Sequence, residues 1–266
     1  MRLLVRLLPL SEPAALPLDN YPLAALIYQS VWLVAPDFAE FLHEEGWQPA
    51  GREAGRQSSG GSAAHKRFKF FVFSRLEQPG KRISGGRQWL RQRPVEWQVA
   101  SPLAEMMELL AEGLARQGVI SLGDRAGTTH LTVTEILELP DPVLSGRMRF
   151  ETLSPLFAAV DDVRPDGRHR KHHLRAEDGR YGERVAANLV SRYRALTGAE
   201  PADPRLEFRF LDAPKAQLVQ YKGTHHHCYL GQFEVSGSEE LIRLGWDGGF
   251  GEGNSKGFGM AGWLES

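Results

Sequence analysis

Two glycine triplets near the C-terminus form the part of this sequence best suited to bind an anion. Gly249-Phe250-Gly251 and Gly257-Phe258-Gly259 enclose a polar core of five residues that contains Lys256. Glycine permits close approach of another backbone and adopts positive φ, and consecutive amides in such a loop can form a concavity that attracts phosphate. The pattern predicts either a phosphate-binding loop or a tight turn with a structural role.

His43 is the residue best suited to proton transfer, because the unperturbed pKa of histidine is about 6.5. It falls in a predicted short helix whose apolar side is formed by Phe38, Phe41 and Leu42. At helical spacing, the His43 side chain points roughly 145° away from that side. We therefore expect it to face solvent, where it is either a general acid or base or an inert surface residue.

A third candidate is the tract His225-His226-His227-Cys228. In an extended strand His225 and His227 share one face. Two imidazoles without further ligands at regular spacing make a weak metal site. We therefore predict a hairpin here, no metal and no other cofactor.

Composition narrows the class of protein. The 266 residues are 42% hydrophobic and 24% charged, which is typical of a globular chain. No run approaches the roughly 18 apolar residues of a membrane span, and the N-terminus lacks the pattern of a secretion signal. Cys228 is the single cysteine, which favours a reducing, cytoplasmic location.

Positive charge is concentrated in two segments. Residues 51–94 hold eleven Lys or Arg against two Glu, a net charge of +9, and residues 164–194 hold nine against four, a net charge of +5. Since the whole chain carries −1, the remainder carries −15. Two basic segments on an acidic body predict either a localised track for a polyanion or two solvated surfaces.

Hydrophobic periodicity predicts the elements that must position these residues. In the first half these are a strand at 2–8, a helix from Pro22, a short helix at 37–45, strands at 67–74 and 88–99, a helix at 103–117 and a strand at 131–139. In the second half these are strands at 147–152, 206–211, 217–221, 229–235 and 257–264 and helices at 181–196 and 238–244.

Both halves approximate the order β-α-β-β-α-β, which is that of a ferredoxin-like domain and of the related RNA-binding sheets. Pro140-Asp141-Pro142 reads as a linker between them. We predict an α+β protein of two tandem ferredoxin-like (RRM-like) domains, residues 1–140 and 141–266.

Several segments resemble the CRISPR-associated repeat-processing endoribonucleases, the sixth Cas family of the RAMP superfamily. The glycine triplets match that family's pattern, and six further matches follow the family order across nearly the whole chain. They are Tyr21-Pro22-Leu23 with Ile27-Tyr28, residues 41–46, residues 68–76, Ser154-Pro155-Leu156, Asn188-Leu189 with Tyr193, and Lys222-Gly223 before Phe233.

The resemblance implies metal-independent cleavage of CRISPR repeat RNA, in which a ribose 2′-OH attacks the neighbouring phosphate. His43 aligns with the family's general acid or base, and Tyr28 with a tyrosine that orients or activates the 2′-OH in some members. Certain members carry a lysine shortly after the histidine. Here that region offers Pro49 and Arg52 instead, so the source of phosphate charge stays open between Arg52 and Lys66.

The resemblance also implies RNA contacts outside the reacting group. We expect phosphate contacts from Lys222, Lys256 and the glycines of the loop, together with Arg67 of the first basic segment and Arg170 and Lys171 of the second. The implied partners are the repeat RNA, an interference complex and a second copy of the chain, with no membrane. The alternatives are a RAMP-type protein that holds guide RNA without cutting it and an unrelated ferredoxin-like enzyme acting on a phosphorylated small molecule.

Overall fold

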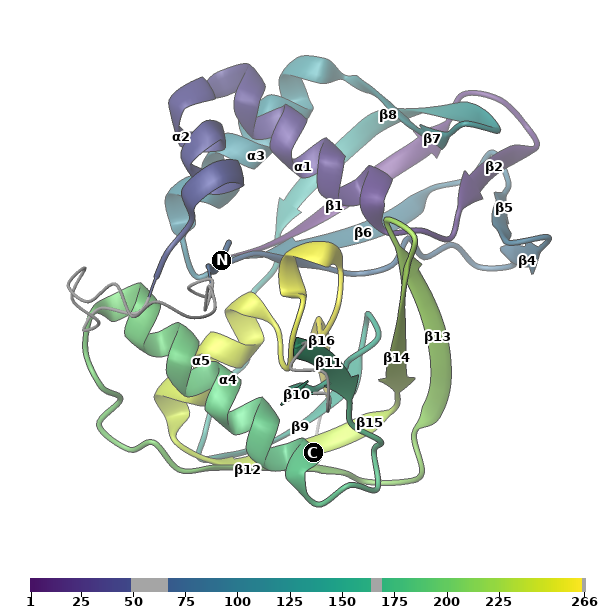
Figure 1. Cartoon of the computed structure of the whole chain (residues 1–266). Helices are drawn as coiled ribbons and strands as arrows, with labels where there is room; N and C mark the ends of the chain where they lie inside the picture. The colour runs from purple at the N-terminus through teal and green to yellow at the C-terminus, as the bar shows by residue number, and fades with distance from the viewer. Residues whose placement is uncertain (49–66, 164–168, 265–266) are drawn as a thin grey trace.

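The computed structural model describes residues 1–48, 67–163 and 169–264. In Figure 1 the N-terminal half lies above the C-terminal half, and each half has helices packed on a sheet. None of the helices in these described ranges is long and apolar enough to cross a membrane.

The N-terminal half is built on an antiparallel sheet with the strand order β3-β6-β1-β8-β7. Without the added edge strand β7, this is the order of a ferredoxin-like sheet, in which the first and third strands lie at the centre. The apolar residues of helices α1 and α3 pack against it in one core. The elements are β1 (Arg2–Pro9), α1 (Tyr21–Val34), β3 (Val72–Phe73), β6 (Val95–Ala100), α3 (Ala104–Gln117), β7 (Val119–Asp124) and β8 (Gly127–Glu138).

The C-terminal half repeats this arrangement with the order β12-β15-β9-β16. Helices α4 and α5 cover one face of the sheet (Figure 1), where Phe150, Phe233 and Val235 are buried. The elements are β9 (Arg147–Thr152), α4 (Arg180–Thr197), β12 (Leu206–Phe210), β15 (Gln232–Gly237), α5 (Glu239–Gly248) and β16 (Ala261–Trp263). The predicted fold of two tandem ferredoxin-like domains is confirmed, while the boundary at residues 140 and 141 stays a prediction.

Two predicted strands were wrong because each runs through a break. Residues 88–99 divide at Pro94, which cannot donate to a sheet, so β5 joins β2 and β4 in a separate three-stranded sheet. Residues 229–235 divide at Gly231, so the first part pairs with β13 in a hairpin. The additional elements are β2 (Ala14–Pro17), β4 (Arg82–Ser84), β5 (Arg87–Leu90), β13 (Lys215–Tyr221) and β14 (Thr224–Leu230).

Other elements differ in extent from the prediction. The helix expected at 37–45 is α2 followed by one turn of π-helix, and the strand expected at 257–264 is reduced to β16 behind a 3-10 turn. The segment 67–74 pairs as a strand only at β3. A hairpin that periodicity did not predict precedes α4. These elements are α2 (Pro36–Glu40), η1 (Phe41–Glu45), β10 (Ala159–Val163), β11 (His169–His173) and η2 (Asn254–Lys256).

Two buried arginines, one from each half, bind the C-terminal end of α5. Arg2 of β1 donates to the carbonyl oxygens of Trp246 and Ala261 at 2.9 and 2.8 Å. Arg192 of α4 donates to those of Gly248 and Gly249 at 2.7 and 2.6 Å. A cation at this end satisfies carbonyls that the helix leaves free and complements its dipole. Arg192 belongs to the second basic segment in sequence but is a structural residue.

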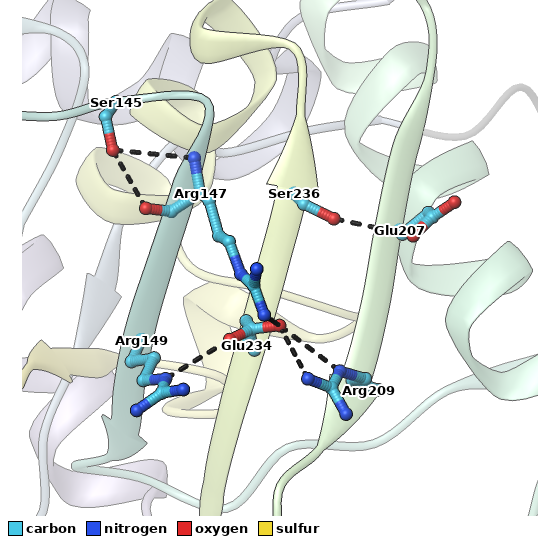
Figure 2. Close-up of polar contacts among 7 residues, drawn as sticks. All are labelled: Ser145, Arg147, Arg149, Glu207, Arg209, Glu234 and Ser236. Carbon is cyan, nitrogen blue, oxygen red and sulfur yellow. Dashed lines mark hydrogen bonds and ion pairs between the residues drawn. The ribbon is translucent and has the colours of Figure 1, made fainter.

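The helix-free face of the C-terminal sheet carries a network of charges. Figure 2 shows Arg147, Arg149 and Arg209 converging on Glu234, with nitrogen to oxygen distances of 2.9–3.2 Å. These bonds hold the pKa of Glu234 at about 2. Glu151 and Glu207 share this face because side chains two residues apart along a strand point the same way. Arginines and glutamates on these strands are therefore balanced, and we interpret the network as structural.

Candidate active site and nucleic-acid interface

The fold brings His43 against Tyr28, although fifteen residues separate them. Pro36 cannot continue α1 because it lacks an amide hydrogen, and the chain turns back there through α2 and η1. The two rings meet edge to face with centroids 5.2 Å apart. Phe71 packs against another edge of Tyr28 at 5.6 Å. The two residues proposed for catalysis therefore form a direct contact.

The His43 side chain is 62% exposed, as its helical position predicts. Its Nδ1 lies 2.7 Å from a carboxylate oxygen of Glu44. Because an ionised carboxylate can only accept a hydrogen bond, Nδ1 carries the proton in this contact and Nε2 is left for a substrate. Burial raises the pKa of Tyr28 above its usual range, so its hydroxyl is a neutral hydrogen-bonding group.

Two cations lie beside this pair. Lys69 donates to the carbonyl oxygen of His43 at 2.6 Å, and Arg67 donates to that of Glu44. Both therefore satisfy the C-terminal end of the π-helical turn. Burial, and then the nearby Arg67, lowers the pKa of Lys69. Sequence reasoning assigned the lysines and arginines of this basic segment to phosphate as a group and singled out Arg67, but it did not place Lys69 beside His43.

The glycine loop lies against the N-terminal half, next to the start of α1. The amide of Asn20 donates to the carbonyl oxygens of Lys256 and Gly257 at 3.1 and 2.9 Å. A Cβ on Gly257 would meet the ring of Phe73 at 2.5 Å. These contacts explain the glycines through close packing between the two halves.

The backbone of the loop is largely occupied by the protein. The amides of Gly249, Gly257 and Gly259 donate to carbonyl oxygens of Gly245, Asn254 and Pro155. Phosphate binding by the glycines stays a prediction, and what the loop presents outward is the Lys256 side chain. Its ammonium lies 5.5 Å from the centre of the Tyr221 ring.

Cations from three separate segments gather around this loop. Lys222 lies at the tip of the β13–β14 hairpin with its ammonium 4.5 Å from the centre of the Tyr21 ring. Burial lowers the pKa of Lys256, and the charges of Lys171 and Lys222 lower it further. Lys171 also contacts Glu252 at 3.2 Å. The structure thus brings together Lys171, Lys222 and Lys256 of the predicted set.

The histidine tract lies in β14, directly after the tip of that hairpin. His226 is buried, and no partner for its Nδ1 occurs in the part of the chain that the structure describes. Burial, and then the charge of His173, lowers the pKa of His226 to about 4. Within the described ranges no three His, Cys, Asp or Glu side chains gather in a way that could hold a metal ion.

Helix α1 joins these two groups into one surface. Tyr28 contacts His43 in the middle of the helix, and Tyr21 contacts Lys222 at its start. Seven residues of helix span about 10 Å, so the two groups lie along one side of α1.

Two of the predicted RNA contacts, Arg52 and Lys66, lie outside the described residues. Arg170 lies in β11, and its side chain is also outside the description.

The fold is that of proteins with two ferredoxin-like domains. A solved structure described as "An RAMP protein binding different RNA substrates" superposes with a TM-score of 0.81 at 24% identity, covering all of both chains. This likeness shows the fold.

Sequence comparison shows similarity to Cas6 proteins. Residues 139–262 match the family model "CRISPR associated protein Cas6, C-terminal". The chain is 26% identical to "CRISPR-associated endoribonuclease Cas6 1" of Methanocaldococcus jannaschii, covering 91% of this chain and 84% of the relative. It is also 26% identical to "Putative CRISPR-associated endoribonuclease-like protein Cas6nc" of Pyrococcus horikoshii, over the full length of both. The chain is therefore similar to Cas6 proteins over most of its length, and the predicted resemblance is confirmed.

Proposed function

We propose that this chain is an endoribonuclease that cleaves CRISPR repeat RNA in precursor transcripts. The ribose 2′-OH attacks the neighbouring phosphate, which leaves a 2′,3′-cyclic phosphate and a 5′-hydroxyl. The observation that carries the proposal is the contact of His43 with Tyr28 beside Lys69, on a surface continuous with Lys222 and Lys256. The homology to an endoribonuclease of Methanocaldococcus jannaschii supports the reaction class.

The geometry suggests a role for each residue. Nε2 of His43 exchanges the proton, either with the 2′-OH or with the leaving 5′-oxygen. The neutral hydroxyl of Tyr28 orients the attacking 2′-OH through a hydrogen bond. Lys69 and Arg67 supply positive charge near the phosphate, the role that a lysine after the histidine has in other family members. No step needs a metal ion.

Cleavage of the repeat encoded beside the gene tests the proposal directly. We expect a single cut that persists in EDTA and stops when the 2′-OH before the scissile phosphate is replaced by hydrogen. The His43→Ala protein should bind this RNA and fail to cut it, whereas Lys69→Met should cut slowly. Full cleavage by His43→Ala would refute the assignment of the site.

The second candidate function is that of a RAMP-type protein that holds guide RNA without cutting it. The name of the superposed RAMP structure mentions RNA binding alone, and the Pyrococcus horikoshii relative is named only as endoribonuclease-like, which is compatible with this candidate. Tight binding of the repeat with no cleavage under any condition would support it.

We also propose that the chain acts in the cytoplasm. An interference complex and a homodimer remain proposals that size-exclusion chromatography with the RNA would test.

A further inference from the structure

A row of three aromatic residues follows one side of α1, and its two end members are exposed. Tyr21, Tyr28 and Trp32 occur at i, i+7 and i+11, so their side chains project within about 40° of one another around the helix axis. Trp32 is 53% exposed and Tyr21 is 43% exposed. The opposite side of the helix holds the buried residues Leu23, Leu26 and Ile27.

A single exposed apolar residue is ordinary on a protein surface. Trp32 differs because of its position relative to the candidate active site. It follows Tyr28 by four residues, one turn of helix and about 6 Å along the axis. Tyr28 in turn contacts His43, beside Lys69. A large exposed ring therefore lies one helical turn from Tyr28, on the side away from Tyr21.

The other end of the row carries the cations. The ammonium of Lys222 lies over the ring of Tyr21. The ring of Tyr21 contacts that of Tyr221 with centroids 6.1 Å apart, and the ammonium of Lys256 lies over the ring of Tyr221. Aromatic rings alternating with cations are the arrangement that binds single-stranded nucleic acid, because bases stack on the rings while cations neutralise phosphates. The positive charge of Lys222 and Lys256 at the Tyr21 end of the row thus favours an RNA strand over an apolar protein partner.

We propose that Trp32 stacks on the base of the unpaired nucleotide next to the scissile phosphate, on the side away from Tyr21. The strand then runs along α1, with the reacting phosphate at His43 and its continuation at Tyr21 and Lys222. This inference rests on the proposed function and adds a residue that positions the RNA. It predicts that the repeat is single-stranded on both sides of the cut.

Binding of a non-cleavable repeat RNA, with hydrogen in place of the reacting 2′-OH, tests the inference. Trp32→Ala should weaken binding by about fivefold to a hundredfold, the usual effect of losing one base stack. Trp32→Phe should retain most of the affinity. Trp263→Ala is the matched control, because Trp263 is 42% exposed in β16 of the other domain.

Two readouts separate stacking from a structural effect. Because Trp32→Phe keeps the other five tryptophans, RNA should quench the fluorescence of the original protein more than that of Trp32→Phe. Abasic substitution one nucleotide at a time should locate a position that weakens binding to the original protein and has little effect on Trp32→Ala. In cleavage assays Trp32→Ala should raise KM more than it lowers kcat.

Equal binding and cleavage by Trp32→Ala, Trp263→Ala and the original protein would overturn this inference and leave the assignment of His43 intact. An abasic position that affects the original protein and Trp32→Ala equally would also overturn it. If the original protein does not bind the repeat at all, both this inference and the proposed function fail.

Discussion

The glycine loop offers a direct test of whether its glycines serve packing or phosphate binding. Gly257 has a φ of +80°, and an added Cβ would lie 2.5 Å from the Phe73 ring and 2.7 Å from the Asn20 amide. The positive φ costs an alanine about 1–2 kcal/mol, and overpacking costs about 1–3 kcal/mol more. We expect Gly257→Ala to lower the free energy of unfolding by about 2–5 kcal/mol.

Gly198→Ala is the matched control. Gly198 ends α4 with a φ of +72°, and nothing lies within 4 Å of its added Cβ. This substitution should cost only the conformational term of about 1–2 kcal/mol. The difference between the two variants isolates the packing of the loop against the N-terminal half. Urea unfolding followed by far-UV circular dichroism measures both.

Gly259→Ala extends the series. Its Cβ would lie 1.9 Å from the carbonyl oxygen of Phe250, a backbone atom that a side-chain rotation cannot move away. It should therefore be the least stable of the three. Equal stability of Gly257→Ala and Gly198→Ala, with RNA affinity lost only in Gly257→Ala, would refute the packing argument and favour phosphate binding by the loop.

Three further substitutions test other parts of the structure. Arg192→Met should lower the free energy of unfolding by about 2–5 kcal/mol in thermal melts, because the Gly248 and Gly249 carbonyls lose their buried partner. Unchanged melting would contradict this. Glu234→Gln should make the free energy of unfolding less dependent on pH in acid. The pKa of Glu234 is lowered from 4.5 to about 2, so its ion pairs stabilise the fold fully above pH 4.5 and progressively less toward pH 2. An acid unfolding curve like that of the original protein would count against the network. Tyr28→Phe should slow cleavage about tenfold without displacing the pH dependence set by a histidine, and a displaced profile would assign proton transfer to Tyr28.

Much of the candidate site could be predicted from local sequence. The exposure of His43 follows from its position opposite Phe38 and Phe41, and the family resemblance supplied Tyr28. Lys69 could not be found this way. It lies 26 residues from His43 in the sequence. The length of the intervening segment does not indicate which part of the fold the chain reaches after it.

The fold shows the same division. Periodicity predicts the β-α-β-β-α-β order of both halves, because each amphipathic element must bury its apolar side. It misplaced the ends of strands at Pro94 and Gly231, since a strand ends where its partner ends as well as where its own sequence changes. It also assigned Arg192 to a basic surface, although the guanidinium lies buried against the end of α5.

The sequence by itself determined the repeated fold, the family resemblance and the exposure of His43, because these depend on residue order and local periodicity. Only the tertiary structure decided that the second glycine triplet packs against Asn20 and Phe73, and that Lys171, Lys222 and Lys256 meet around one loop. The contacts of Asn20 with Gly257 and of Lys171 with Glu252 join segments more than 80 residues apart, and they depend on how the parts of the chain pack together. That packing is also what aligns the cations with the aromatic row of α1.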